Sequence, residues 1–413
     1  MLATLLLTMK IFFDDPLFDA QLVRTMNHVY HNGADIGECI TTAHRIKNKD
    51  TDSWYKEWTA TADRLYKEGE QSASSGHLTS AGEAYLKASN YYRTSYIFMI
   101  GSPKDVRVQT AYQKQKDCFR KALRGINIAA EIISIPYENT SLPGYFLKAD
   151  HSNTSRPTLI ITGGYDCTAE ELYFFSAAAA LRRGYNCLIF DGPGQGGALI
   201  EQGMYFRPDW ENVITPVVNY LYTKNEVQKE QIALMGISFG GYLAPRSVTK
   251  EHRISALITD PAQLDMYEAV KIRMPEFLLN YMDSKSSFKN GIANKIIRSV
   301  LKDPVKGWSL RRGMAVHGVS SVKEYIHLMK EYSIKGKTDS IRCATLVCDA
   351  ENDEIAAFAK TVYDLLQCPK KYILFKNEEG AGEHCEDGNR SLFNQRVFDW
   401  LDEQYKYRID IKN

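Results

Sequence analysis

The sequence predicts an α/β protein with a mostly parallel, doubly wound sheet, an α-helical N-terminal domain and a helical cap inserted into the sheet. Helical patterns with few strand signals fill residues 1–130, whereas short apolar runs alternate with helical stretches in residues 131–413. This alternation is typical of strands that are buried on both faces of a parallel sheet. The apolar runs are Ile132–Ile135, Tyr145–Leu147, Thr158–Ile161, Cys187–Phe190, Ile232–Ile237, Ala256–Thr259, Thr345–Cys348 and Tyr372–Phe375.

The N-terminal domain is predicted from helical patterns such as those at residues 53–62 and 81–89. The second pattern, with small and tyrosine residues continuing to Tyr92, resembles one helix of a tetratricopeptide hairpin. A tetratricopeptide array would repeat about every 34 residues, and the sequence shows no such period. We therefore interpret these residues as packing contacts.

A sharp turn with a serine at its tip is the most informative motif. The six residues Gly236–Gly241 join a strand-like run to a helix-like run, which is the pattern of a nucleophile elbow around Ser238. Such a turn brings backbone and side chains too close for a Cβ two positions before and after the serine. Gly236 and Gly240 meet that requirement, so Ser238 is the predicted nucleophile.

A serine hydroxyl needs a base, and in this order of motifs an acid and then a histidine should follow it. After the strand-like run at residues 344–348 comes an acidic loop, in which we choose Asp353 as the acid. Asp349 and Glu351 lie close by in the sequence and remain alternatives. A merely solvated role for Asp353 is the other interpretation.

His384 is the predicted base because it follows the acidic loop and lies in a glycine-containing loop that can aim its ring. His252, His317 and His327 precede the acid, and their default interpretation is a surface or cap role. Cys385 is a tempting alternative nucleophile, but adjacent loop residues point apart and Ser238 has the better setting.

Two backbone amides should stabilise the oxyanion that forms when the serine attacks. One is expected from Phe239. The other should come from the turn at residues 162–166, where glycines allow the backbone to approach a substrate, with Gly164 or Tyr165 as the donor. Without the elbow, this turn would indicate only a tight bend.

Residues 262–341 separate the sixth and seventh apolar runs and are far too long for an ordinary connection of ~2–6 residues. They are predicted to fold as a helical cap. Its apolar residues either form the cap's own core, the simpler interpretation, or roof a pocket and exclude water. These residues are Met266, Tyr267, Met274, Phe277, Leu278, Leu279, Tyr281 and Met282.

A glycine-rich loop after the fourth apolar run, residues 191–197, also satisfies the GxGxxG pattern of dinucleotide-binding folds. Such a fingerprint belongs near the start of its sheet, opens directly into a helix, and has an acid at the end of the next strand. Asp209–Glu211 lies in no predicted strand. We interpret the loop as a tight turn beside the active-site mouth and expect no cofactor.

Composition bounds the other function classes. The net charge of +1 and the lack of a basic run with interleaved aromatics argue against nucleic acid binding. The eight cysteines show no CxxC pair and no metal-ligand spacing, so we expect reduced cysteines, a cytoplasmic location and no metal. Met1–Met9 is apolar but lacks a basic start and a cleavage site, so we expect an upstream extension or a short packed segment. No stretch approaches a membrane span.

The elbow, the turn at residues 163–166, the loop at residues 191–196 and Gly382–Cys385 together resemble one branch of the α/β-hydrolase superfamily. That branch includes dihydroxypseudooxynicotine hydrolase, fungal polyketide-shortening hydrolases and bacterial fermentation-respiration switch proteins. Residues 311–319 are similar to a stretch of the fungal members. The resemblance covers residues 131–400, with a helical N-terminal region of matching size.

This resemblance implies the α/β-hydrolase fold, a small-molecule substrate and, by analogy with relatives, a homodimer. Several members cleave a C–C bond beside a ketone, and one uses an additional glutamate. Asp265 or Glu268 is the candidate for that acid here, with a charge at a helix start as the alternative interpretation. Asp166 and His317 are expected at the substrate pocket.

The sequence therefore predicts a Ser238–His384–Asp353 hydrolase that attacks a small-molecule carbonyl group. A C–C bond hydrolase of β-dicarbonyl or polyketide-like compounds is favoured. The alternatives are a carboxylesterase and a non-catalytic switch or binding protein on the same scaffold. A peptidase is less favoured, since no propeller-like gating domain precedes the sheet.

Overall fold

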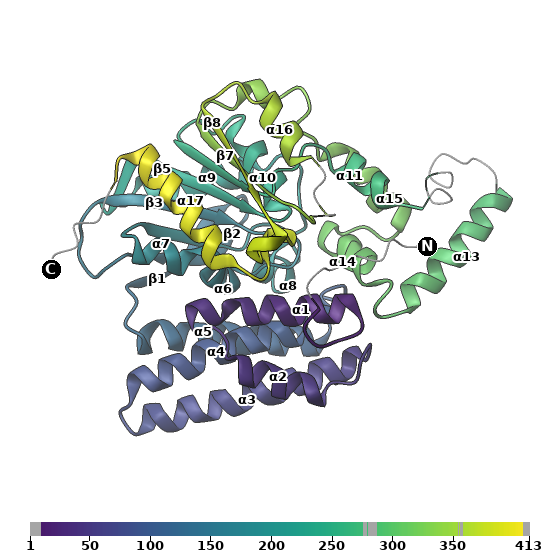
Figure 1. Ribbon diagram of the computed structural model, residues 1–413, viewed down its shortest axis with the longest axis horizontal. Coiled ribbons are helices and arrows are strands. Elements are labelled where there is room, and N and C mark those ends of the chain that lie inside the picture. The colour runs from purple at the N-terminus through teal and green to yellow at the C-terminus, as the bar shows by residue number, and fades with distance from the viewer. Residues whose placement is uncertain (1–9, 276–278, 280–286, 354, 356–357, 408–413) are drawn as a thin grey trace.

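The computed structural model describes residues 10–275, 279, 287–353, 355 and 358–407, and an eight-stranded sheet forms its centre (Figure 1). The strand order is β1-β2-β4-β3-β5-β6-β7-β8; β1 and β2 run antiparallel to their neighbours and the others are parallel. Each of the eight predicted runs lies in a strand, and the predicted fold class is confirmed. The strands are β1 (Ala130–Tyr137), β2 (Thr140–Leu147), β3 (Arg156–Thr162), β4 (Asn186–Phe190), β5 (Val227–Ile237), β6 (Ala256–Asp260), β7 (Ala344–Ala350) and β8 (Lys370–Phe375).

Successive side chains of the central strands enter two different cores because side chains alternate across a sheet. Leu159 and Ile161 of β3 belong to one core, whereas Ile160 between them belongs to the other. The first core contains side chains of α6 (Ala169–Leu172), α7 (Ala178–Arg182) and α17 (Arg390–Tyr405), with a π-helical turn at Tyr173–Ala177. The second contains those of α8 (Gly196–Ile200), α9 (Glu211–Tyr222), α10 (Gly240–Val248) and α16 (Ala359–Leu365).

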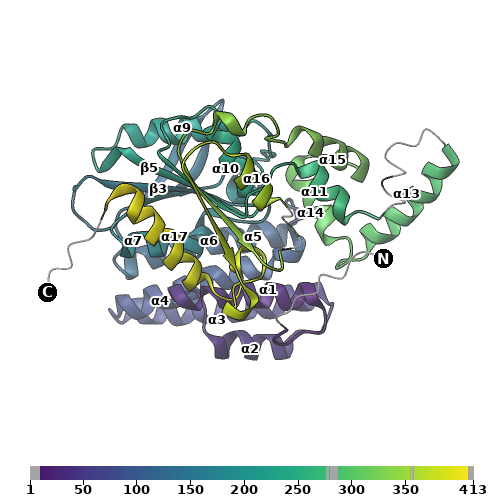
Figure 2. The same cartoon turned by 45° about the horizontal axis from the view of Figure 1, so that its top comes forward.

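From residue 10 onwards, five helices precede β1, and they form a layer beneath the α6 and α17 side of the sheet (Figures 1 and 2). They are α1 (Pro16–Asn27), α2 (Ile36–Arg45), α3 (Thr51–Ser74), α4 (Leu78–Ser95) and α5 (Val106–Gly125), with 3-10 turns at His28–His31 and Ile97–Met99. Trp54 and Trp58 of α3 are fully buried in the core that also contains Leu159 of β3. The helical layer and the sheet therefore share one continuous hydrophobic core.

The described residues between β6 and β7 are largely helical, as expected of the cap, and project beyond the end of the sheet (Figure 1). Its helices are α11 (Met266–Arg273), α13 (Ser287–Lys302), α14 (Trp308–His317) and α15 (Val322–Leu328), with 3-10 turns at Met329–Glu331 and Thr338–Ser340. Met266 is buried, and Tyr267 and Met274 pack against the same core. Phe277, Leu278, Tyr281 and Met282 lie outside the described residues.

Within the described part of the chain, no helix combines the length and the apolar character needed to cross a bilayer. The eight cysteines all lie in that part, and none of them forms a disulfide.

Candidate active site

Ser238 lies at the tip of a strained turn between β5 and α10, with a φ of 58°. A Cβ on Gly236 would lie 2.0 Å from the carbonyl oxygen of Gly240, and one on Gly241 would lie 1.7 Å from that of Pro261. Both distances are far below van der Waals contact, so the turn requires these glycines. The sequence anticipated Gly236 and Gly240; Gly241 is equally constrained because the turn packs on the segment after β6.

The structure brings Ser238, His384 and Asp353 together although they lie in three separate loops. His384 Nε2 is 2.9 Å from Ser238 Oγ, and His384 Nδ1 is 2.7 Å from Asp353 Oδ2. The two alternative acids have other partners: Asp349 accepts from the Tyr372 hydroxyl, and Glu351 accepts from the backbone amide of Asn377. Of these three acids, Asp353 is the one that lies within hydrogen-bond distance of the His384 ring.

The electrostatics of this group suit a general base. Burial lowers the pKa of His384, but the Asp353 carboxylate raises it more, so that the pKa lies above its ordinary value of 6.5. The Asp353 side chain is fully buried, whereas that of His384 is 22% exposed. An imidazole that donates Nδ1–H to this carboxylate presents a free lone pair at Nε2 towards the serine hydroxyl.

The turn after β3 packs directly on the nucleophile. A Cβ on Gly164 would lie 2.7 Å from Ser238 Cβ and 3.1 Å from the backbone nitrogen of Phe239. Gln195 Nε2 donates to the carbonyl oxygen of Gly163 at 2.7 Å. In a trans peptide the N–H points away from the carbonyl, so this bond orients the Gly164 amide away from Gln195.

The Cys167 thiol distinguishes between Gly164 and Tyr165 as oxyanion donors. Burial raises the pKa of Cys167 to about 12, and a backbone hydrogen bond from Gly164 opposes that rise. This influence of the Gly164 amide on the thiol favours the Tyr165 amide, together with that of Phe239, as the donors for a substrate oxyanion.

The glycine-rich loop at residues 191–197 is filled by its own side chains. Both carboxylate oxygens of Asp191 accept backbone hydrogen bonds, from Ala169 and Gly197, and Tyr112 donates a third. A Cβ on Gly192 would lie 2.6 Å from the Trp210 ring. The loop does open into a helix, α8, which the sequence did not predict, and the Gly197 amide in the first turn of that helix donates to Asp191.

Gln195 in this loop is a supporting residue that the sequence analysis missed. Its Oε1 accepts from the Gly192 amide while its Nε2 holds Gly163. The tight-turn interpretation gave the loop a place beside the site without naming a side chain. The only available signal was its position between two glycines, which does not reveal a partner in another loop.

His317 is buried beside the turn after β3 and belongs to helix α14 of the cap, so of its two default interpretations, a surface or a cap role, the cap position holds. Its Nε2 is 3.1 Å from the Tyr165 hydroxyl and its Nδ1 is 3.1 Å from the Tyr332 hydroxyl. Burial lowers the pKa of His317 to about 3, so the ring is neutral at physiological pH. The expected position of His317 at a substrate pocket stays a prediction.

Asp166 is held by arginines from three elements. Arg24 of α1 donates to Oδ1 at 2.9 Å, Arg312 of α14 pairs with Oδ2 at 2.5 Å, and Arg93 of α4 donates to the backbone carbonyl at 3.2 Å. Burial raises the pKa of Asp166, but these arginines outweigh it and hold the pKa well below the ordinary range. This carboxylate is a structural anchor, so it is poorly placed for the substrate contact that the sequence suggested.

The two candidates for an additional acid both lie in the first turn of α11. Asp265 caps the helix by accepting from the Glu268 amide at 2.9 Å, and it pairs with Lys335 at 3.2 Å. Glu268 pairs with Lys271 at 3.1 Å and its side chain is 38% exposed. These contacts agree with the alternative interpretation, in which both are charges at a helix start.

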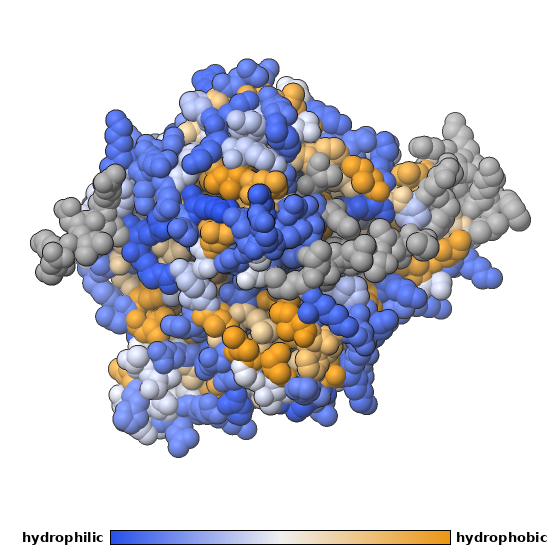
Figure 3. Space-filling model, viewed as in Figure 1, coloured by the Kyte–Doolittle hydropathy of each residue, from blue (hydrophilic) through white to orange (hydrophobic). Residues whose placement is uncertain are grey.

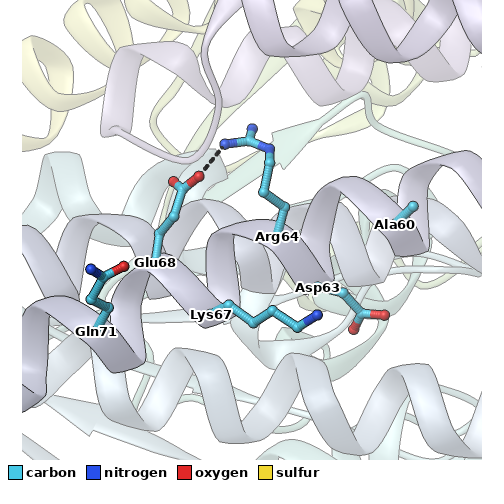
Figure 4. Close-up of a pocket in the computed structure, with 6 residues that line it drawn as sticks. All are labelled: Ala60, Asp63, Arg64, Lys67, Glu68 and Gln71. Carbon is cyan, nitrogen blue, oxygen red and sulfur yellow. Dashed lines mark hydrogen bonds and ion pairs between the residues drawn. The ribbon is translucent and has the colours of Figure 1, made fainter.

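Two surface hollows lie elsewhere, and neither is lined by Ser238, Asp353 or His384. One lies along α3 and contains the Arg64–Glu68 ion pair (Figure 4). Its lining residues are Ala60, Asp63, Arg64, Lys67, Glu68 and Gln71. The other lies where α1 meets the start of α17, and its lining includes the apolar side chains of Val23, Met26 and Ile36. Figure 3 shows orange, hydrophobic surface over α1 and α2. Among the described residues, no group of His, Cys, Asp and Glu side chains has the arrangement of a metal site.

The family model described as "Esterase FrsA-like" matches residues 45–320. Hydrolase acrC from Aspergillus aculeatus is 31% identical, over 96% of this chain and 98% of the relative. The 20-hydroxy-prefusarin hydrolase FUS2 from Gibberella moniliformis is 32% identical, over 97% and 99% of the two chains. Among solved structures, the 2,6-dihydroxy-pseudo-oxynicotine hydrolase superposes with a TM-score of 0.72 at 20% identity, covering 93% of this chain and 97% of the other.

Proposed function

The chain belongs to the FrsA-like esterase family of α/β-hydrolases, and from that premise we propose that it cleaves small-molecule carbonyl compounds with a Ser238–His384–Asp353 triad. One observation carries this proposal: Ser238 Oγ, the His384 ring and Asp353 Oδ2 form a continuous hydrogen-bonded relay, with links of 2.9 and 2.7 Å. A protein with only a binding role would not require that relay.

The first half-reaction forms an acyl-enzyme. His384 Nε2 removes the Ser238 proton as Oγ bonds to the carbonyl carbon, and the Asp353 carboxylate stabilises the imidazolium. The carbonyl oxygen becomes an oxyanion that accepts from the backbone amides of Phe239 and Tyr165. Each such donor contributes roughly 10²–10³-fold to kcat in serine hydrolases.

The leaving group then takes a proton and water completes the reaction. For an ester, the C–O bond breaks and His384 protonates the departing oxygen. For a β-dicarbonyl compound, the C–C bond breaks, the electron pair leaves as an enolate conjugated to the second carbonyl group, and the proton of His384 reaches the enolate carbon through a water molecule. A second water, deprotonated by His384, hydrolyses the acyl-enzyme and restores Ser238.

We favour C–C cleavage of polyketide-like β-dicarbonyl compounds. The support is the full-length similarity to fungal hydrolases, one of which is named for 20-hydroxy-prefusarin. Carboxylester cleavage is the second candidate because Asp265 and Glu268 are occupied as helix-start charges. Without an additional acid, His384 must supply every proton, which is simpler for an oxygen leaving group than for carbon.

The test is intact-mass analysis after treatment with a fluorophosphonate, comparing wild type with Ser238→Ala and His384→Ala. Ser74→Ala is the matched control, since Ser74 is an exposed serine at the end of α3. We expect one adduct on wild type and on the control, and none on the two site variants. An unlabelled, folded wild type, or an adduct that survives in Ser238→Ala, would contradict the triad. A 1,3-diketone and a p-nitrophenyl ester, assayed in parallel, then separate the two bond types.

A further inference from the structure

Helix α14 of the cap contacts two successive residues of the turn after β3, Tyr165 and Asp166. Its Arg312 pairs with the Asp166 carboxylate at 2.5 Å, and its His317 lies 3.1 Å from the Tyr165 hydroxyl. The Arg312 guanidinium also lies 4.1 Å above the Trp308 ring, which restricts its orientation. Helix α14 therefore holds both Tyr165, which is proposed to supply an oxyanion donor, and Asp166, the residue that follows it.

The His317 ring is fixed by hydrogen bonds on both sides. A neutral imidazole has one donor and one acceptor nitrogen, and here each nitrogen is 3.1 Å from a phenol hydroxyl, Tyr165 on one side and Tyr332 on the other. Because the ring is buried, either bond is costly to break. Gly318, with a φ of 67°, ends α14 directly after His317 and so sets the position of the ring along the helix.

The rings of the two proposed oxyanion donors are stacked on each other. Tyr165 and Phe239 have ring centroids 4.4 Å apart and planes 8° apart. The hydroxyl end of the Tyr165 ring is the end that His317 holds. A movement of that ring would therefore shift the Tyr165 backbone relative to Phe239, and with it the distance between the two amides.

From this arrangement we infer that His317 is a positioning residue of the oxyanion hole, through which cap helix α14 contributes to transition-state stabilisation without contacting the reacting atoms. The inference rests on the proposed function, because it requires the Tyr165 and Phe239 amides to bind an oxyanion. Both nitrogens of His317 are used by phenols, so the residue exchanges no proton with substrate. Oxyanion stabilisation depends on donor distances of about 2.7–3.1 Å, so a small displacement of Tyr165 lowers the rate.

The experiment measures kcat, KM and the affinity for a trifluoromethyl ketone, which forms a tetrahedral oxyanion adduct with a catalytic serine. The variants are His317→Phe, Tyr165→Phe and the double variant. His317→Phe should lower kcat by roughly 10–100-fold, which is less than the effect of removing an oxyanion donor completely. It should weaken trifluoromethyl ketone binding by the same factor. KM and the pH profile should stay close to those of wild type.

Tyr165→Phe keeps the stacked ring and removes only the hydroxyl, so it tests the same bond in a variant that should fold. His317→Phe also loses the bond to Tyr332, and Tyr165→Phe also loses the 3.4 Å contact with the Tyr325 hydroxyl. The His317–Tyr165 bond is broken by both substitutions, so the double variant should lose less than the sum of the two single effects. Tyr242→Phe is the matched control: it loses a buried phenol hydrogen bond, to the carbonyl of Pro208, beside the same Phe239 ring. It should lower stability and leave kcat within about twofold.

Unchanged kcat and unchanged trifluoromethyl ketone affinity in a folded His317→Phe protein would overturn the inference and leave His317 a packing residue. Loss of the acidic limb of the pH profile would also overturn it, because His317 would then act as an acid or base. The proposed function is tested separately, by activity or labelling that survives in Ser238→Ala, so the two failures are distinguishable.

Discussion

The backbone amide of Ser238 donates a hydrogen bond of 2.6 Å to the carbonyl oxygen of Asp260. Asp260 ends β6, so the nucleophile is positioned by the neighbouring strand as well as by its own turn. The Asp260 carboxylate is in turn paired with Arg390 of α17 at 2.6 Å. Arg390 also donates to Glu386 and to the carbonyl oxygen of Cys385, the residue after His384. One buried guanidinium therefore connects the supports of the nucleophile and of the base.

We expect Arg390→Met to destabilise the protein by about 3–5 kcal/mol, because it leaves the buried Asp260 carboxylate without its cation. Burial, and then the charge of Asp260, raise the pKa of Glu386 well above its ordinary range, so Asp260 is the carboxylate on which the expected loss depends. Urea unfolding measures the loss. Arg64→Met removes a half-exposed ion pair with Glu68 and should change stability by less than about 1 kcal/mol. A similar small effect for Arg390→Met would show that the buried pair is dispensable.

Replacement of Asp353 by Asn tests the acid and predicts a change in pH dependence. His384 must be neutral to accept the serine proton, and its pKa is raised above 6.5, so activity should fall as the pH decreases through that raised value. In Asp353→Asn the raising carboxylate is gone, so the acidic limb should move to lower pH while kcat drops about 10⁴-fold. Asp349→Asn is the control, since the Asp349 carboxylate accepts from the Tyr372 hydroxyl and the Ala350 amide. Full turnover in Asp353→Asn would contradict this role for Asp353 and assign it to Asp349 or Glu351.

Local patterns predicted what depends on nearby residues. The eight strands followed from short apolar runs, and the Ser238 turn followed from its glycines. The hydrogen-bonded pairing of His384 with Asp353 agreed with the order of motifs along the chain. In each case the feature was predicted either from residues within about ten positions of one another or from the order of motifs along the chain.

Contacts between distant segments were not predictable. The arginines that hold Asp166 come from α1, α4 and α14, separated from it by 142, 73 and 146 residues. A lone aspartate after a glycine pair therefore suggested a pocket residue, and only packing revealed an ion-pair anchor. For the same reason a surface or cap role was the default for His317, and its contacts with the Tyr165 and Tyr332 hydroxyls could not be predicted.

The elbow makes a prediction about stability that does not involve chemistry. Gly241→Ala places a Cβ 1.7 Å from the Pro261 carbonyl oxygen, which is backbone and cannot move aside without shifting the end of β6. We expect a loss of about 3 kcal/mol, the upper part of the usual range for overpacking, together with a lower kcat. Gly37→Ala in α2 is the matched control, since a Cβ there meets nothing within 4 Å and should stabilise the helix by about 0.5–1 kcal/mol. Equal urea midpoints for the two variants would contradict the steric argument.

A buried carboxyl pair between α6 and the glycine-rich loop predicts a pH-dependent stability. Burial, and then the charge of Glu170, raise the pKa of Asp191 to about 7, and burial raises that of Glu170. Raised pKa values mean that the folded state holds protons that the unfolded chain releases near pH 4. The stability that these two protonated carboxyl groups contribute is therefore complete at low pH and is lost as the pH rises to about 7.

Glu170→Gln removes one of these charges while its Oε1 can still accept from the Tyr145 hydroxyl. Its stability relative to wild type should therefore increase between about pH 5 and about pH 8, by on the order of 1 kcal/mol, since one pKa unit corresponds to about 1.4 kcal/mol. Urea unfolding across this range measures the difference. Glu378→Gln, with a side chain 75% exposed, should run parallel to wild type. If the stability of Glu170→Gln also ran parallel to that of wild type across this pH range, the two buried carboxyl groups would not influence each other in the folded protein.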